Sequence, residues 1–489
     1  MNLGRMLEES FHRYPNNAAI LYDGKSLTYE ALHSAVNSLG NELRGLGIQK
    51  GDKVAIMLSN CPEFVISYFA VQKLGAVAVT VNILSTPYEL RHLIGNSDAK
   101  CLITETPLAK RYEEIREDIP LCNHIITTSG LDTASQFRET IEKGPFTLKM
   151  PDIADEDPAV MIYTAGLTGR PLGAVLTHRN LWTQSNLVTD LYHTTEKDRS
   201  LAIIPLFHAF GAVVNMLGAI RIGAGIVLMD RFTMEAILGS IEKDKVTYIA
   251  AVPRLFLGMV MYPDTDKYDI SSLDFCITGG STMPPDFIPM FEDKFKCILR
   301  EGYGLTEASP VCSVGMRDKA HKTGSIGTVI PGVEAKAVDD QGNEVPRGEI
   351  GELVIRGVNV MKGYYKNEEA TAQVIRNGWL YTSDLAKIDE DGYIFLTGRK
   401  KRMIITSGFN VYPREVEMVL ELHPAVQASM VVGKPDLMRG EIVKALIVRN
   451  PDITVSEREL TRHCRNYLSS YKVPRAIEFV ESIDMPSVS

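Results

Sequence analysis

Apolar runs alternate with helical patterns through roughly the first two-thirds of the chain, and this alternation constrains the fold more than any other feature. After Thr28, for example, Leu32, Val36, Leu39 and Leu43 recur at helical spacing. The strand-like runs are apolar at nearly every position and lie at residues 54–58, 77–81, 202–204, 226–229, 248–252 and 275–278. Such strands are buried on both faces, as in parallel sheets covered by helices. We therefore expect an α/β fold built on parallel sheets.

The pattern changes after Thr323, where glycines punctuate short β-rich runs such as residues 352–356. This change predicts a small antiparallel barrel or sheet. A further unit begins near Lys401 and combines strand-like runs with a helical pattern at residues 456–468. Because 489 residues exceed what one hydrophobic core usually serves, we expect separate domains, at residues 1–399 and 400–489.

Composition excludes several classes of protein. The net charge of −9 argues against a nucleic-acid partner, since neutralising phosphates requires a basic face. The seven scattered cysteines contain no Cys-x-x-Cys pair, which predicts reduced thiols and neither a disulfide framework nor a zinc site. The N-terminus lacks the apolar core of a signal peptide. The most apolar stretch, residues 211–229, is interrupted by Asn215, Arg221 and glycines, so we expect no transmembrane segment and a cytoplasmic protein.

A loop rich in glycine and hydroxyl groups, residues 163–173, separates two apolar runs. Its glycines let the backbone approach an anion closely, and exposed backbone amides form a concavity that attracts phosphate. Thr164 and Thr168 add hydroxyl donors. Glycine-rich turns are common, so this loop indicates a phosphate site only in combination with other segments.

Four other segments carry groups suited to nucleotide chemistry. Residues 302–307, Gly-Tyr-Gly-Leu-Thr-Glu, offer an aromatic ring, a hydroxyl and a carboxylate of the kind that Mg²⁺ prefers. Asp384 is suited to ribose hydroxyls, Arg399 to a ribose or phosphate, and His208 lies alone in an apolar loop. Taken singly, each has a structural alternative: a turn with a core tyrosine, an Asx turn, a solvated charge run and a buried histidine.

Together, the order and spacing of these segments resemble the adenylate-forming (ANL) superfamily, in its acyl-CoA synthetase branch, and in particular fatty-acid–CoA ligases. The resemblance runs from about Ser26 to the end of the chain. It implies a large N-terminal domain of two α/β subdomains plus a β-barrel, followed by a small, mobile α+β C-terminal domain.

The resemblance also implies roles for individual residues. His208, Thr164, Glu307 and Lys401 match catalytic positions: His208 the gate between the acyl and thiol pockets, Glu307 the Mg²⁺ ligand and Lys401 the hinge. The residues that match positions around the nucleotide and the thiol channel are Thr164, Gly166, Thr168, Gly169, Gly280, Ser281, Tyr303, Gly304, Thr306, Asp384, Arg399 and Gly408. Among these, Tyr303 matches the residue that stacks on adenine.

The implied reaction has two steps: a carboxylic acid and MgATP form acyl-AMP and pyrophosphate, and coenzyme A then displaces AMP. The expected partners are the acid, ATP, Mg²⁺ and coenzyme A. Whether the protein forms a homodimer is left open. A medium- or long-chain fatty acid is the first choice of substrate, and an aryl or alicyclic acid the next. Two other readings stay open: an acyl-AMP ligase that loads a carrier protein, and a catalytically impaired protein that binds a nucleotide or acyl-CoA.

The chain departs from the family pattern at two places. Ala165, Leu167 and Leu172 stand where the family usually has Ser, Thr and Lys. The chain also stops at Ser489, just short of the Gly-Lys whose lysine bridges the carboxylate and the α-phosphate in the family. We therefore expect this chain to adenylate poorly and still to convert a supplied acyl-AMP to a thioester.

The first departure generates a prediction about Arg170, which lies two residues before Leu172. If its guanidinium replaces the missing ammonium group, Arg170→Ala raises the KM for ATP about fivefold, the equivalent of the ~1 kcal/mol that an exposed ionic contact contributes. Steady-state kinetics at saturating acid and coenzyme A measures this constant. An unchanged KM for ATP would show that Arg170 does not replace the lysine.

Overall fold

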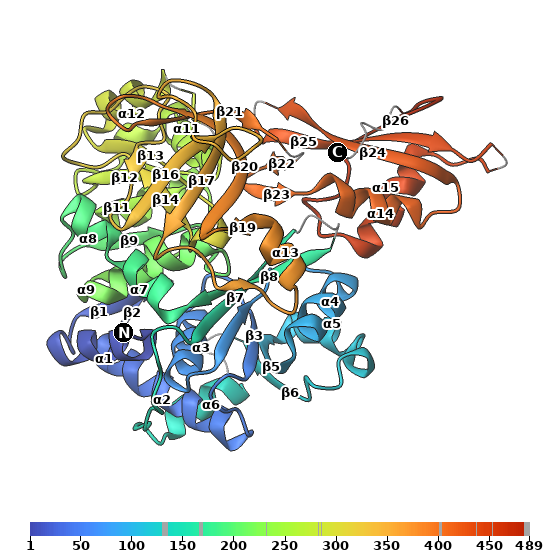
Figure 1. Cartoon of the computed structure of the whole chain (residues 1–489). Helices are drawn as coiled ribbons and strands as arrows, with labels where there is room; N and C mark the ends of the chain where they lie inside the picture. The colour runs from blue at the N-terminus through green and yellow to red at the C-terminus, as the bar shows by residue number, and fades with distance from the viewer. Residues whose placement is uncertain are drawn as a thin grey trace.

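The computed structural model describes residues 1–129, 135–165, 170–230, 232–281, 283–284, 286–400, 403–436, 438–451 and 453–483. Two α/β units and a small antiparallel sheet form the large domain, and the C-terminal domain lies beside them (Figure 1). This arrangement confirms the predicted fold class. In the part of the chain that the structure describes, no helix is long and apolar enough to cross a membrane.

The first α/β unit is a seven-stranded sheet in which five neighbouring strands run parallel. Its strands, in spatial order, are β18 (Gly363–Tyr364), β8 (Pro171–Thr177), β7 (Pro158–Ala165), β4 (Val77–Thr80), β3 (Lys53–Met57), β5 (Ala99–Glu105) and β6 (His124–Thr128). Its helices are α2 (Tyr29–Gly45), α3 (Pro62–Lys73), α4 (Pro87–Ser97), α5 (Ala109–Glu113) and α6 (Gln136–Lys143).

Successive residues of β3 explain why this strand is apolar throughout. Val54 and Ile56 belong to the core cluster that contains Phe64 and Phe69 of α3. The intervening residues, Ala55 and Met57, belong to a second cluster that contains Leu90 and Ile94 of α4. Because side chains alternate between the two faces of a strand, burial of both faces requires apolar residues at every position.

The second α/β unit is a nine-stranded sheet that follows the same principle. Its strands, in spatial order, are β15 (Thr328–Val329), β14 (Val311–Val314), β13 (Ile298–Gly304), β12 (Phe275–Thr278), β11 (Tyr248–Ala251), β9 (Arg199–Ala202), β10 (Gly225–Leu228), β1 (Ala18–Tyr22) and β2 (Lys25–Thr28). The strands from β13 to β1 are parallel. Helices α10 (Met234–Asp244), α11 (Pro253–Met261) and α12 (Phe287–Phe295) share one core cluster with this sheet.

The remaining helices of this part of the chain are α1 (Leu3–Arg13), α7 (His178–Ser185), α8 (Leu187–Tyr192) and α9 (Gly218–Ile222), with a π-helix at Gly211–Leu217 before α9. Residues of α1, α7, α8, α9 and the π-helix belong to the large cluster on the other face of the sheet. The apolar stretch at residues 211–229 is thus a buried helical segment followed by β10, as the sequence predicts.

The glycine-rich region forms a five-stranded antiparallel sheet, one of the two forms that the sequence allowed. Its strands are β16 (Val333–Val338), β17 (Gly351–Gly357), β20 (Trp379–Ile388) and β19 (Ile375–Arg376), and β21 (Ile394–Arg399) also pairs with β20. Helix α13 (Glu368–Val374) precedes β19. The last strand of the sheet ends at Arg399, and the domain boundary between residues 399 and 400 stays a prediction.

The C-terminal domain has a core of its own. Its sheet orders β23 (Phe409–Val411), β22 (Ile404–Thr406), β25 (Gly440–Arg449) and β24 (Val426–Asp436), with β26 (Ala476–Phe479) also paired to β25. Helices α14 (Pro413–Glu421) and α15 (Glu457–Tyr467) pack against each other and share this core. In Figure 1 these two helices face α4 of the first α/β unit.

Asn60 joins the two α/β units of the large domain. This buried residue follows β3, and its amide group donates hydrogen bonds of 3.0 Å to the carbonyls of Ala202 and Ile204 in the second unit. Its carbonyl oxygen accepts a 2.8 Å bond from the backbone N–H of Leu206. The loop that carries His208 therefore begins at a fixed position relative to the first sheet.

We expect replacement of the Asn60 side-chain amide to lower the free energy of unfolding. Asn60→Ala leaves buried backbone groups without partners, which costs about 1–3 kcal/mol. Urea unfolding monitored by circular dichroism measures the change in the free energy of unfolding. The exposed Asn16 supplies a matched control, because Asn16→Ala should leave the free energy of unfolding unchanged. Equal stability of the two variants would contradict the role given to Asn60.

Candidate active site

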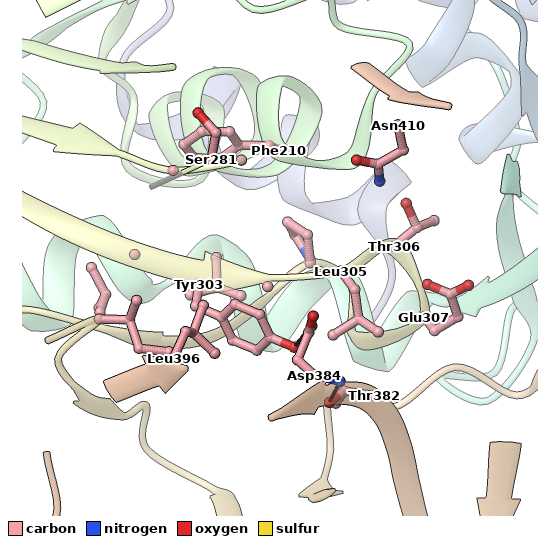
Figure 2. A pocket seen from close by; sticks show the side chains of 18 of the residues that line it. Phe210, Ser281, Tyr303, Leu305, Thr306, Glu307, Thr382, Asp384, Leu396 and Asn410 are labelled. Atoms are coloured by element: carbon pink, nitrogen blue, oxygen red, sulfur yellow. Dashed lines mark hydrogen bonds between the residues drawn. The ribbon is translucent and has the colours of Figure 1, made fainter. Parts of the chain in front are cut away.

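A cavity of about 280 Å³ opens where strands of both α/β units end and the C-terminal domain meets them. Thr164 comes from β7, residues 279–281 follow β12, and residues 303–307 stand at the end of β13. In parallel α/β sheets, ligands bind outside the carboxyl ends of the strands, so the topology itself places a site here. Figure 2 shows Tyr303 pointing toward Asp384, with Thr306, Glu307 and Asn410 farther along the same cavity.

Most of the site residues predicted from the sequence line this one cavity. They are Thr164, His208, Gly280, Ser281, Tyr303, Gly304, Thr306, Glu307, Asp384, Arg399 and Gly408. Gly166, Thr168, Gly169 and Lys401 lie outside the described residues, so their predicted roles stay predictions. The structure thus brings together residues that are up to 244 positions apart, from Thr164 to Gly408.

Asp384 is held between two donors at one end of the cavity. The Tyr303 hydroxyl donates a 2.5 Å hydrogen bond to Oδ2 of Asp384, and Nε of Arg399 donates a 2.5 Å bond to Oδ1. The antiparallel pairing of β20 with β21 sets Asp384 opposite Arg399. Burial and the neighbouring Asp384 carboxylate raise the pKa of Tyr303 far above its usual value, so the tyrosine remains a donor.

Glu307 occupies the opposite part of the cavity. Its Oε1 accepts hydrogen bonds from the hydroxyls of Thr164, at 2.9 Å, and Tyr364, at 2.8 Å. Burial, followed by the negative charge of Glu307, raises the pKa of Tyr364 well above its ordinary range. Two donors from separate strands therefore fix this carboxylate, and both act on the same oxygen.

The residues present fit a Mg²⁺ ion that arrives with a nucleotide. No cluster of three or more His, Cys, Asp or Glu side chains suited to a metal occurs in the described parts of the chain. Mg²⁺ is typically held by one or two carboxylates together with substrate phosphates. Glu307, with both of its side-chain hydrogen bonds on Oε1, supplies one such carboxylate.

His208 lies where the first cavity meets a second one of about 430 Å³. Its Nδ1 accepts a 3.3 Å hydrogen bond from the backbone N–H of Phe210, which leaves the proton of the neutral ring on Nε2. Burial lowers the pKa of His208 to about 4, so the ring is neutral at neutral pH. Thr164, Thr306, Asn410 and Tyr412 also line both cavities.

The first cavity also has an apolar part. The side chains that give it this character are Leu187, Val188, Leu191, Phe210, Val214, Ile277, Val314 and Ile326. Several come from α8 and from the π-helix, and Gly211 allows that helix to pack closely. A Cβ atom at Gly211 would lie only 2.6 Å from the carbonyl oxygen of Pro205.

Sequence reasoning missed several lining residues. Tyr364 was not singled out, and neither was Glu301, whose burial raises its pKa to about 7. Glu301 precedes the Gly-Tyr-Gly segment, and its alternation with Leu299 and Tyr303 on the buried face of β13 is a signal that could have identified it. Tyr364 carries no local signal, because its partner Glu307 is 57 positions away.

Comparison with known proteins identifies the family. The family model described as AMP-binding enzyme matches residues 7–365, and the model described as AMP-binding enzyme C-terminal domain matches residues 415–487. The chain therefore belongs to the AMP-binding enzyme family. This finding confirms the resemblance to adenylate-forming enzymes of the acyl-CoA synthetase branch.

Individual relatives are similar over nearly their full length. The chain is 34% identical to the long-chain-fatty-acid–CoA ligase of Bacillus subtilis (strain 168), with 99% of this chain and 92% of the relative covered. The structure of the amide bond synthetase from Marinactinospora thermotolerans has a TM-score of 0.91 at 28% identity and covers 100% of this chain and 97% of its own. An anthranilate CoA ligase in complex with anthranoyl-AMP has a TM-score of 0.78 at 30% identity, with 99% and 94% covered.

The bond between Tyr364 and Glu307 generates a prediction about metal dependence. Tyr364→Phe removes one of the two donors to Oε1, and a hydrogen bond to a charged group contributes about 1.5–3 kcal/mol. We expect kcat/KM for MgATP to fall at least about tenfold, with partial recovery at high Mg²⁺ concentration.

The neighbouring Tyr365 provides the control for this variant. Its hydroxyl donates an equally short 2.8 Å bond to the carboxylate of Asp98, away from both cavities. Tyr365→Phe should therefore leave the MgATP kinetics unchanged. The same loss in both variants would mean that Tyr364 acts only through the stability of the fold.

Proposed function

We propose that this protein joins a medium- or long-chain fatty acid to coenzyme A with MgATP, through an enzyme-bound acyl-adenylate. The observation that carries the proposal is the single cavity in which the polar groups around Asp384 and Glu307 continue into an apolar part. Its polar end suits a nucleotide, and its apolar end suits an acyl chain. The similarity to a long-chain-fatty-acid–CoA ligase supports the same assignment.

In this proposal the large domain binds and orients the nucleotide. Tyr303 stacks on the adenine, while Asp384 and Arg399 hold the ribose hydroxyls. Thr164, Thr306 and the loop that contains Gly166, Thr168 and Gly169 hold the phosphates. Glu307 holds Mg²⁺, which neutralises charge on the phosphates when it is bound.

The first step forms a bond between the acid carboxylate oxygen and the α-phosphorus, and pyrophosphate leaves. In the second step the thiol sulfur of coenzyme A bonds to the acyl carbon, AMP leaves with the electron pair of the broken bond, and the thiol proton passes to solvent. Holding the reactants together contributes up to about 7–11 kcal/mol toward such barriers. His208, at the junction of the two cavities, separates the acyl end from the route of the thiol.

The second cavity supports coenzyme A as the acceptor. Phe409, Asn410 and Tyr412 of the C-terminal domain line it together with Arg170 of the large domain. We propose that Gly408 and residues 409–412, which we call the channel loop, form the thiol channel. We also propose that Lys401 is the hinge about which the domain turns. A carrier protein would present the same type of thiol, so the experiment must compare coenzyme A with a carrier protein as the acceptor.

An acid panel tests the proposal. The protein is incubated with MgATP and an acid, or with a synthetic acyl-adenylate, and with either coenzyme A or a phosphopantetheinyl carrier protein as acceptor. The acids are straight chains of increasing length, benzoate and cyclohexanecarboxylate. We expect AMP release to peak with one straight-chain length and to require the thiol. A peak with benzoate would instead assign an aryl acid, and release that requires a phosphopantetheinyl carrier protein would assign carrier loading.

The same panel can refute the enzyme assignment. No AMP release from any acid or acyl-adenylate, together with tight binding of ATP measured by calorimetry, would leave only the binding role. Asp384→Asn supplies the control for the site, because it weakens the contact with Arg399 and should lower AMP release with every acid.

A further inference from the structure

A buried ion-pair cluster connects the C-terminal domain to the large domain. Nζ of Lys472 lies 2.7 Å from Oε1 of Glu89 in α4 and 2.6 Å from Oε1 of Glu415 in α14. The hydroxyl of Ser469 donates a 2.6 Å hydrogen bond to Oε2 of Glu89. Glu89, Lys472 and Glu415 are only 7%, 8% and 7% exposed, so each of these charges depends on its partners in this position.

Uncharged contacts beside the ion-pair cluster join the same short segment of the C-terminal domain to the large domain. The Thr86 hydroxyl donates a 2.8 Å hydrogen bond to the carbonyl of Tyr467. The rings of Tyr88 and Tyr467 pack edge to face with centroids 5.2 Å apart. The segment from Tyr467 to Lys472 thus docks on the N-terminal end of α4.

The docked segment also reaches the channel loop. The ring of Tyr471, next to Lys472, stacks on Phe409 with centroids 4.5 Å apart. Phe409 lines the second cavity beside Asn410 and Tyr412. Docking on α4 therefore determines where the channel loop stands, through one continuous set of contacts.

The pair between Glu89 and Lys472 is specific to this orientation of the domain. Glu415 and Lys472 belong to the same domain and stay together if it turns, whereas Glu89 remains on α4. Burial opposes ionisation of Glu89, but the Lys472 ammonium group outweighs it and holds the pKa of Glu89 below its usual value. A buried pair of this kind is costly when either partner is missing, so a partly docked domain is disfavoured.

We propose that Glu89 and Lys472 form an interdomain latch that holds the C-terminal domain with residues 409–412 against the thiol channel, and so favours the thiol-transfer step over adenylation. The latch rests on the proposed two-step ligase function. Both residues act as positioning residues, since they set the place of the loop through Tyr471 and Phe409.

The variant Glu89→Gln tests the latch with the least disturbance. A glutamine keeps a side-chain oxygen that can accept the backbone N–H of Thr86, as Glu89 does in the capping box of α4, and removes the negative charge that faces Lys472. Ser469→Ala is a milder second variant, because it removes only one hydrogen bond to Glu89. Glu478→Gln is the control, since it breaks a 2.6 Å ion pair with Lys444 that lies within the C-terminal domain.

Double electron–electron resonance spectroscopy measures the domain orientation, as the distance between spin labels attached at Glu113→Cys and Glu457→Cys. Both positions are exposed, and the seven native cysteines are buried and so protected from labelling. We expect one main distance in the parent protein and in Glu478→Gln. Glu89→Gln should add a second population at a different distance, and Ser469→Ala a smaller one. A distance distribution in Glu89→Gln identical to that of the parent would overturn the latch.

Single-turnover kinetics gives the second readout. We expect Glu89→Gln to slow thioester formation from a supplied acyl-adenylate at least tenfold, and to leave acid-dependent pyrophosphate exchange no slower than the low rate expected of the parent. An equal loss in both half-reactions, or a higher KM for coenzyme A with unchanged distances, would contradict the latch. If the parent protein forms no thioester, the proposed function fails, and the distance measurement still decides whether Glu89 and Lys472 hold the domain.

Discussion

The site depends on two carboxylates, the buried Asp384 and the half-buried Glu307, that collect donors from separate parts of the chain. Asp384 binds Tyr303 from the second α/β unit and Arg399 from the antiparallel sheet. Glu307 binds Thr164 from the first unit and, through Tyr364, the strand that pairs with β8. Because a buried charge without partners is costly, each carboxylate fixes the relative positions of the elements that meet at it. The polar end of the cavity is therefore shaped by contacts between elements that are far apart in the sequence.

This constraint also explains how one cavity can serve two chemical steps. The polar groups gather where the parallel strands end, while several of the apolar side chains come from helix α8 and the π-helix. His208 stands between this cavity and the one lined by the C-terminal loop. In the proposed reaction, the acyl chain, the nucleotide and the thiol reach one point from different sides, and residues of the C-terminal domain line both cavities.

Local sequence patterns predicted much of this arrangement, and the parts they missed share a physical cause. The apolar runs around Val54 and Ile249 predicted the parallel sheets, since burial on both faces leaves a continuous local signature. The Gly-Tyr-Gly-Leu-Thr-Glu segment and Asp384 were identified because chemistry concentrates in short motifs. Tyr364 and the pair of Glu89 with Lys472 were not, because their meaning lies in contacts with residues 57 and 383 positions away. Such contacts arise only when the chain folds.

The central claim is that acid and ATP react in this cavity to give an acyl-adenylate. Carboxylate oxygen labelling tests it most directly: the protein is incubated with an ¹⁸O-labelled straight-chain acid, MgATP and coenzyme A, and the products are analysed by mass spectrometry. Attack of the carboxylate on the α-phosphorus predicts one ¹⁸O atom in each AMP and none in pyrophosphate. Label in a phosphate product derived from the β- or γ-phosphate, or AMP without label, would contradict the account.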